Sequence, residues 1–393
     1  MIELPAFATT LIGSWPRSKK LLKAKRRYEQ GQLSEEDFYA QAEEETKRVI
    51  ELQDDLGLDI ITSGELTRDN YSSFVATHLD GAELLSMNDM VDYMPDKQAF
   101  EDILSVLDVP SISIKNAICT GRLGYHPLAV HELKWLKKYT DKPVKITLPG
   151  PYLMTRSMWL KELSGQAYES KEDLGQAVLK ILAREIKNLQ DLGVEIIQFD
   201  EPVLTEVIFS EGKTRSFMCG ALSEKKDFKE EIAFATDLIA QAMSQIDRTK
   251  SLASLHVCRG NWSKDESILL EGPYTALVPL FRSVQADLLT LEFSTPRAGE
   301  LSALLRDDII RENCRLGLGV ENPRLDEAES VQSIVDRAEE ALEYLPKERL
   351  LLNPDCGFAT FANRPVNDDA HIPGKIKALV EAAHTLRDRH GEA

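Results

Sequence analysis

Eight short runs of apolar and β-branched residues recur along the chain, and stretches with helical patterning separate them. Runs of this length and composition are typical of buried strands. Strands that alternate with helices form a parallel sheet, and eight of them close a (β/α)8 barrel. The sequence therefore predicts an α/β protein with the TIM-barrel fold. The predicted strands are residues 8–12, 59–63, 144–148, 195–199, 251–256, 288–292, 316–320 and 350–353.

Two of the predicted helices are long and have recognisable ends. One spans about residues 34–56, where Ser34 and Asp37 form a capping pattern at the start and Gly57 follows the end. The other spans about residues 171–192.

The stretch 66–142 is too long to be a plain connection between two barrel strands. We predict a helix at 99–107, a β-hairpin within 111–124 and a further helix at 130–139. We expect this stretch to be an insertion between the second and third strands, over the mouth of the barrel. No linker rich in proline, glycine or serine divides the chain, so residues 1–393 are predicted to form a single domain.

The charge balance and the cysteine content restrict the partners and the compartment. The chain has 47 Lys and Arg residues against 65 Asp and Glu residues, a net charge of −18. Such a balance argues against binding to nucleic acid and to an anionic membrane surface. Five cysteines in this length do not suggest a disulfide framework, and no secretory signal or membrane-spanning run is recognisable. We therefore expect a cytoplasmic protein whose thiols stay reduced.

Four potential metal ligands lie at or just past the ends of predicted strands: His256, Cys258, Glu292 and Cys356. Residues i and i+2 of a strand point to the same face, so the sequence His-Val-Cys directs an imidazole and a thiol to one place. Taken alone, that pair is more simply an ordinary buried strand. The addition of a carboxylate and a second thiol at two other strand ends favours zinc, which accepts nitrogen, sulfur and oxygen together.

Carboxylates follow two other predicted strands. Asp200 and Glu201 end one strand and Glu65 ends another, and each glutamate comes eight residues after a glycine that ends a helix. Chance repetition of a common unit explains the spacing equally well, although the carboxyl ends of barrel strands are where barrel enzymes carry their chemistry. The first strand runs into a turn whose amides and serine hydroxyl can hold a carboxylate, formed by Ile12, Gly13 and Ser14.

Taken together, these segments resemble the catalytic barrel of the cobalamin-independent methionine synthase family. They occur in the order of the family and span nearly the whole chain. The resembling blocks are Thr9-Thr10-Leu11-Ile12-Gly13-Ser14, Ser63-Gly64-Glu65, Pro149-Gly150-Pro151, Asp200-Glu201-Pro202, His256-Val257-Cys258, Leu291-Glu292 and Asn353-Pro354-Asp355-Cys356-Gly357.

The resemblance implies a zinc-dependent methyltransferase that converts homocysteine to methionine. It implies that homocysteine or methionine binds with its ammonium group on Glu65 and Asp200, and that Glu206 lies near the methyl donor. It further implies that the zinc ligands are His256, Cys258, Glu292 and Cys356, and that the carboxylate of the amino acid lies on Ile12, Gly13 and Ser14. We expect Glu292 to be the ligand that loosens when the substrate sulfur arrives.

The sequence departs from the family pattern in three places that concern the methyl donor. Full-length enzymes of the family carry a second, N-terminal barrel, whereas this chain has the length of one barrel. The His-Ser-Pro segment of the family is replaced by Glu321-Asn322-Pro323, and its Asn-Trp-Ser segment by Arg156-Ser157-Met158. The donor therefore stays open between methyltetrahydrofolate, a corrinoid with an accessory donor protein, and another source. The alternatives are a corrinoid-linked methyltransferase for another small thiol, a decarboxylase on a related barrel, and a non-catalytic zinc-binding homologue.

Overall fold

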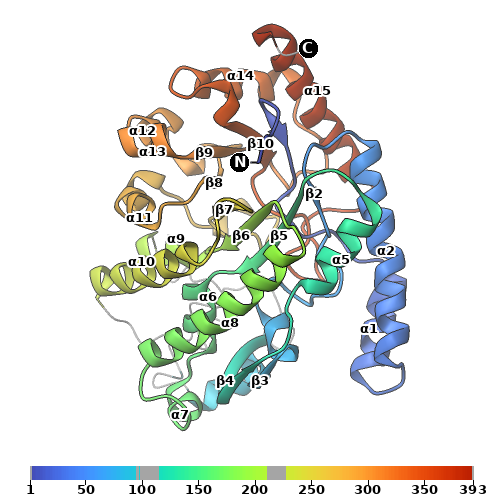
Figure 1. Ribbon diagram of the computed structural model, residues 1–393, viewed down its shortest axis with the longest axis vertical. Helices are drawn as coiled ribbons and strands as arrows, with labels where there is room; N and C mark the ends of the chain where they lie inside the picture. The colour runs from blue at the N-terminus through green and yellow to red at the C-terminus, as the bar shows by residue number, and fades with distance from the viewer. Residues whose placement is uncertain (1, 94–96, 98–114, 210–226, 392–393) are drawn as a thin grey trace.

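The computed structural model describes residues 2–93, 97, 115–209 and 227–391. Eight parallel strands form its central sheet, in the order β1-β10-β9-β8-β7-β6-β5-β2 (Figure 1). These strands are β1 (Ala8–Thr9), β2 (Ile61–Thr62), β5 (Val144–Pro149), β6 (Ile196–Asp200), β7 (Leu252–Val257), β8 (Leu288–Glu292), β9 (Arg315–Glu321) and β10 (Leu350–Pro354). Each of them overlaps one of the eight predicted strands.

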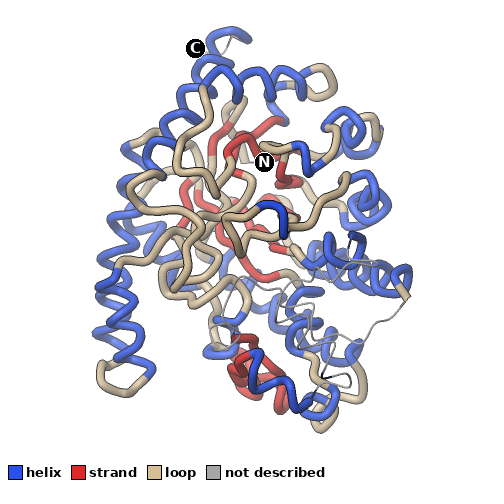
Figure 2. The backbone as a smooth tube through the Cα atoms, turned by 180° about the vertical axis from the view of Figure 1, so that it is seen from behind, coloured by secondary structure: helices blue, strands red, loops and turns tan. Residues whose placement is uncertain are grey.

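Backbone contacts between β1 and β2 close the sheet on itself. Thr10 forms a parallel bridge with Ile60. The amides of Asp59 and Ile60 both donate to the carbonyl of Thr9, at 3.2 and 3.1 Å. Figure 2 shows the strands at the centre and the helices around them. The predicted (β/α)8 barrel is confirmed.

Helices cover the outside of the barrel, and the two long ones end as predicted. The hydroxyl of Ser34 accepts the amide of Asp37 at 3.1 Å, and Gly57 has a φ of +90°, which suits glycine at the end of a helix. The α-helices are α1 (Lys19–Glu29), α2 (Glu35–Asp55), α3 (Met87–Met90), α5 (Val130–Tyr139), α6 (Pro151–Met158), α7 (Lys161–Ser164), α8 (Lys171–Asp191), α9 (Val203–Phe209), α10 (Phe228–Ser244), α11 (Val278–Val284), α12 (Leu301–Leu305), α13 (Asp308–Asn313), α14 (Val331–Leu342) and α15 (Ile372–His390). Among the described helices, none is long and apolar enough to cross a membrane.

The interior of the barrel changes from apolar to polar toward the carboxyl ends of the strands. Six buried apolar side chains form one interior cluster near the amino ends: Ala8, Ile60, Ile196, Leu252, Leu288 and Leu351. Because side chains alternate along a strand, the next interior positions on four of these strands are polar. They are Gln198, Ser254, Thr290 and Asn353. A further step along β6, β7 and β8 reaches Asp200, His256 and Glu292, so the fold itself brings the predicted site residues to one end.

The insertion 66–142 contains an antiparallel hairpin that differs from the predicted one. β3 (Leu79–Ser86) pairs with β4 (Lys115–Tyr125), so residues 115–124 are part of a single strand and the prediction of a hairpin within 111–124 is wrong. Gly124 allows close approach of the two strands: a Cβ at this position would lie 2.3 Å from Oδ2 of Asp80. The predicted helix 130–139 is confirmed as α5, whereas 99–107 and 111–114 lie outside the described residues.

The start of the insertion is fixed to the loop that follows β10. The amide of Ala362 donates to the carbonyl of Asp69 at 2.8 Å, and Asn70 forms a bridge with Phe361. Tyr71, the next residue, lines the pocket at the barrel mouth. The hairpin itself contacts α6 and α7, below the strand ends in Figure 1.

Candidate metal centre and amino-acid pocket

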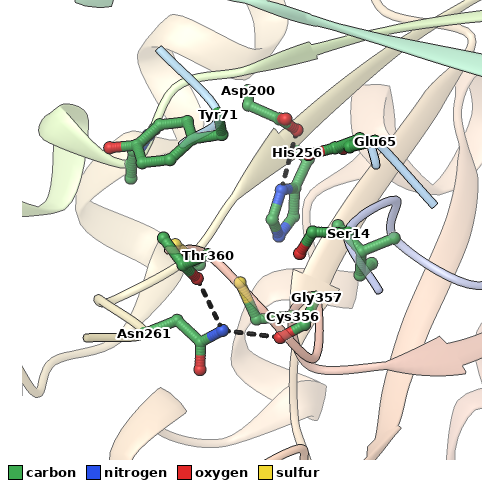
Figure 3. Close-up of a pocket in the computed structure, with 12 residues that line it drawn as sticks. Ser14, Glu65, Tyr71, Asp200, His256, Asn261, Cys356, Gly357 and Thr360 are labelled. Atoms are coloured by element: carbon green, nitrogen blue, oxygen red, sulfur yellow. Dashed lines mark hydrogen bonds and ion pairs between the residues drawn. The ribbon is translucent and has the colours of Figure 1, made fainter. Parts of the chain in front are cut away.

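One imidazole and two thiols converge at the carboxyl ends of β7 and β10. The potential ligand atoms of His256, Cys258 and Cys356 lie within 4.8 Å of one another, and all three residues are buried. His256 lies within β7, and the cysteines follow the ends of β7 and β10. Figure 3 shows the imidazole between Asp200 and Cys356. The two thiols come from strands that are separated by β8 and β9, so only the closed barrel brings them together.

The imidazole of His256 is oriented by Asp200. Nδ1 donates to Oδ1 of Asp200 at 2.9 Å, while Nε2 is buried and has no hydrogen-bond partner among the described residues. Burial lowers the pKa of His256, but the hydrogen bond and the charge of Asp200 outweigh it, and the net shift is upward. A histidine held by a carboxylate at one nitrogen and free at the other is the arrangement of a metal ligand.

The two cysteines share a hydrogen bond and therefore titrate as a pair. Hydrogen bonding with Cys356 lowers the pKa of Cys258, and the same interaction raises the pKa of Cys356. One thiolate is thus stabilised next to Nε2 of His256, where its negative charge favours a cation.

Glu292 interacts electrostatically with both cysteines, but it is not one of the residues whose ligand atoms lie within 4.8 Å of one another, and the protein holds its carboxylate. Oε2 accepts the amide of Arg259 at 3.1 Å. Oε1 is buried and has no hydrogen-bond partner in the described part of the chain. Two unsatisfied buried atoms, Nε2 of His256 and Oε1 of Glu292, thus accompany two sulfur atoms. Buried polar atoms without partners are uncommon, and one nitrogen, one oxygen and two sulfurs suit zinc, so these residues fit that ion.

Asp355 fixes the loop that carries Glu292 to the loop that carries Cys356. Its Oδ1 accepts the amides of Phe293 and Ser294, both at 3.0 Å. Gly319 leaves room for this carboxylate, because a Cβ there would lie 2.4 Å from Oδ1 of Asp355. Burial raises the pKa of Asp355 to about 6.

Glu65 provides a second carboxylate on the other side of Asp200. It is buried, adopts a φ of +55°, and its Oε1 accepts the hydroxyl of Thr147 at 2.7 Å. Burial raises its pKa, and the nearby charge of Asp200 adds to that shift. A positive φ is unfavourable for a glutamate, so surrounding contacts must stabilise this conformation. The hydroxyl of Ser63, which accepts the amide of Glu65 at 3.2 Å, is one of them.

The predicted turn after β1 lies against Glu65 and the Cys356 loop. A Cβ on Gly13 would lie 2.1 Å from Oε1 of Glu65, so only glycine allows this approach. The carbonyl of Ser14 accepts the amide of Phe358 at 3.0 Å, and its hydroxyl accepts the amide of Ala359 at 3.3 Å. The turn and the cysteine loop are therefore one structural unit.

A single pocket contains most of the predicted residues. It is lined by Ile12, Ser14, Glu65, Tyr71, Asp200, Pro202, His256, Cys258, Asn261, Cys356, Gly357 and Thr360. Figure 3 shows Ser14 and Glu65 on the same side as the imidazole and Tyr71 facing them across the pocket. The structure thus brings the turn, both carboxylates and the metal-ligand group together.

Two predicted carboxylates have other surroundings. Glu206 of α9 is buried, and its Oε1 lies 3.3 Å from Nη2 of Arg156; it is not one of the pocket-lining residues. Glu201 points away from the pocket and accepts the amides of Tyr152 and Leu153, at 2.8 and 2.9 Å, at the start of α6. It therefore caps a helix, whereas its neighbour Asp200 faces the site.

Sequence reasoning did not find several residues of the site. Arg259 and Arg324 approach Glu292, and Tyr71, Asn261 and Thr360 complete the pocket. Nδ2 of Asn261 donates to Gly357 and Thr360, at 2.6 and 2.9 Å, and so joins the loops after β7 and β10. The only available signal was the position of Arg259 and Asn261 directly after the His-x-Cys pair.

The fold and the site define an α/β barrel enzyme class with a candidate metal centre at the carboxyl ends of the strands. Within this class, the chain belongs to the family described as cobalamin-independent synthase, catalytic domain, whose sequence model matches residues 7–384. The family prediction is confirmed.

Curated relatives carry the name 5-methyltetrahydropteroyltriglutamate–homocysteine methyltransferase. The one from Bacillus licheniformis is 27% identical over 396 residues, which cover 99% of this chain and 44% of that protein. The one from Bacillus subtilis is 26% identical, over 98% of this chain and 43% of that protein. The chain thus spans less than half the length of these relatives.

Two solved structures share the fold over nearly their full length. A B12-independent methionine synthase from Shewanella sp. W3-18-1, in complex with selenomethionine, has a TM-score of 0.72 at 20% identity and covers 98% of this chain and 99% of its own. A putative vitamin-B12 independent methionine synthase from Listeria monocytogenes has a TM-score of 0.67 at 20% identity, with the same coverage.

Proposed function

We propose that this chain is a zinc-dependent methyltransferase that transfers a methyl group from a methyltetrahydropteroyl glutamate to the sulfur of homocysteine, giving methionine. The names of the curated relatives support both the acceptor and the folate donor. The proposed zinc ligands are His256, Cys258, Glu292 and Cys356. We further propose that residues 1–393 act as one catalytic domain, in the cytoplasm, where the thiols stay reduced.

One observation carries the proposal. Nε2 of His256 is buried without a hydrogen-bond partner in the described chain, and it lies with two thiols beside a pocket that contains two carboxylates. Oε1 of Glu292 is likewise buried without a hydrogen-bond partner there. The first group suits a cation that binds sulfur, and the second suits an ammonium group. Homocysteine offers a thiol and an ammonium group on the same short molecule.

The residues of the chain have distinct roles in this proposal. Zinc, when bound, converts a thiol into a thiolate at neutral pH, because free thiols titrate near pH 8.5. Asp200 keeps the imidazole in the orientation that frees Nε2, and its second oxygen, with Glu65, receives the substrate ammonium. The turn formed by Ile12, Gly13 and Ser14 receives the substrate carboxylate. With the amino-acid end fixed at these points, the sulfur is aligned for attack on the methyl carbon.

The donor is expected on the side of the pocket where Tyr71 faces Glu65; Pro202 also lines this pocket. Glu206 follows Pro202 on α9, and we assign it to the donor side. Its Oε1 lies 3.3 Å from Nη2 of Arg156, the first residue of the segment that replaces the family segment Asn-Trp-Ser.

The test is methyl transfer by the zinc-loaded protein to homocysteine, with methyltetrahydrofolate triglutamate and methylcobalamin as donors in parallel. We expect methionine from the folate donor. Cys356→Ser should abolish the product, whereas Cys314→Ser, a buried thiol outside the site, should retain it. Methionine formed only from methylcobalamin would refute the donor assignment. No methionine from either donor, with zinc bound, would refute the function.

A further inference from the structure

Two buried arginines face the carboxylate of Glu292. Nη1 of Arg259 lies 3.5 Å from Oε2, and Nη2 of Arg324 lies 4.0 Å from Oε1. Their side chains are 0% and 1% exposed, and that of Glu292 is 3% exposed. Two guanidinium charges therefore share one carboxylate in a region without solvent.

Other contacts fix both arginines in place. Nε and Nη2 of Arg259 donate to the carbonyl of Gly272 at 2.9 and 2.6 Å, and its guanidinium carbon lies 3.8 Å from the ring centre of Tyr274. Nη2 of Arg324 donates to the carbonyl of Gly260 at 2.5 Å. These contacts hold both arginines beside Glu292, whose Oε2 also accepts the amide of Arg259 at 3.1 Å.

The ion pairs with Glu292 are loose. Contacts of 3.5 and 4.0 Å are longer than the 2.7–2.9 Å typical of a charge-assisted hydrogen bond. Nη1 of Arg259 and Oε1 of Glu292 both lack a hydrogen-bond partner in the described chain. A rotation of the carboxylate toward either guanidinium would form the missing bond, while its present position leaves Oε1 free for a metal ion.

The positive charge of the two arginines is explained if the site binds a thiol. The inference therefore rests on the proposed function. Two cysteine thiolates and one glutamate carboxylate exceed the charge of a divalent ion by one negative charge. A substrate thiolate adds a second. Two buried guanidinium groups balance both charges, which an uncompensated buried site could not tolerate.

We propose that Arg259 and Arg324 are positioning residues that act through Glu292. They would hold its carboxylate if the sulfur of the substrate took its place at a bound metal ion, and would so favour a thiol over a hydroxyl substrate. Homocysteine loses its thiol proton to the buffer on binding, whereas the hydroxyl group of its oxygen analogue homoserine stays neutral. The two arginines therefore matter for the first ligand and not for the second.

The experiment measures the dissociation constants of homocysteine and homoserine for protein loaded with Co²⁺, whose sulfur-to-metal absorption reports thiolate binding without a methyl donor. Arg324→Met should weaken homocysteine binding about tenfold or more, because one charge is lost near the anionic group, and leave homoserine binding within about twofold. Arg324→Lys keeps the charge and should stay within about threefold of the wild type. Arg349→Met, which removes an arginine bound to the carbonyl of Arg311 far from Glu292, is the control and should change neither constant.

A double variant tests whether the arginine acts through the carboxylate. In Glu292→Gln protein, the addition of Arg324→Met should weaken homocysteine binding less than about threefold, because the ion pair is already absent. Should Arg324→Met fail to load cobalt, Arg324→Gln carries the same expectation. If both arginine variants bind homocysteine as the wild type does, the inference is wrong and the proposed function stands. If homocysteine raises no sulfur absorption in the wild type, the proposed function fails.

Discussion

Lys145 allows a stringent test of how charge is distributed inside this barrel. Its side chain is buried in β5, and Nζ has no hydrogen-bond partner among the described residues. Burial lowers its pKa from 10.5 to about 7, against the opposing charges of Asp200 and Glu65. We predict that Lys145→Met stabilises the protein, because methionine has similar length and no charge to bury.

The magnitude and its sign follow from proton linkage. Between pH 7 and 10.5 the unfolded chain keeps the proton on Lys145 while the folded protein releases it, so stability rises with pH. The shift corresponds to a folding penalty of about 5 kcal/mol at or below pH 7, since one pKa unit is worth about 1.4 kcal/mol. The penalty should fall by about 1.4 kcal/mol per pH unit, to about 2 kcal/mol at pH 9.

The assay is urea denaturation of wild type and Lys145→Met at pH 7, 8 and 9. The variant should have the larger free energy of unfolding at pH 7, and its advantage should shrink as the pH rises. Lys375→Met is the matched control, because Lys375 is equally buried but pairs with Glu321 and Glu329 at 3.1 and 3.3 Å. Its removal takes the cation away from the buried carboxyl group of Glu321 and should destabilise the protein by about 3–5 kcal/mol.

Two results would refute this reasoning. One is a Lys145→Met protein that is less stable than the wild type at pH 7. The other is a stability difference that stays constant from pH 7 to pH 9, which would mean that Lys145 keeps its proton in the folded state throughout this range.

Three further predictions concern the site. Cys356→Ser should lose most of the zinc and all methyl transfer, as measured by metal analysis and methionine formation; full activity would exclude the ligand role. Asp200→Asn should weaken homocysteine binding and also lower zinc affinity about 10–100-fold, because Asp200 orients His256; unchanged affinities in calorimetry would contradict both roles. Gly13→Ala should destabilise the protein by about 1–3 kcal/mol and weaken homocysteine binding, since the added methyl group collides with Glu65; a thermal unfolding curve and a binding constant like those of the wild type would contradict this.

The barrel could be predicted because its strands carry a local signal. Each of the eight runs is short, apolar and next to a helix, and a helix start such as Ser34 is fixed by its own hydroxyl. The predicted hairpin was wrong because β4 pairs with β3, which ends about thirty residues upstream. Nothing near β4 in sequence indicates that pairing.

The part of the site that depends on the alternation of side chains along a strand could be predicted from the sequence. His256 and Cys258 lie on one face of one strand end, and Asp200 occupies the corresponding interior position of the neighbouring strand. The different roles of the adjacent carboxylates Asp200 and Glu201 could not be predicted from the sequence, because only the structure shows Glu201 at the start of α6. The buried position of Arg259 depends on Tyr274 and on other residues distant in the sequence. From the sequence alone, a charged residue such as Arg259 is expected at the surface.

Asp355 bears on how the proposed metal site would form. Its hydrogen bonds to the Phe293 and Ser294 amides hold Glu292 and Cys356 at a set spacing through protein atoms alone. If the proposed zinc binds, we expect folding and zinc uptake to be separate events, unlike in small zinc fingers, where the ion drives folding. A cell that runs short of zinc would then retain intact polypeptide, and the proposed activity should return at the rate of metal capture, without new synthesis.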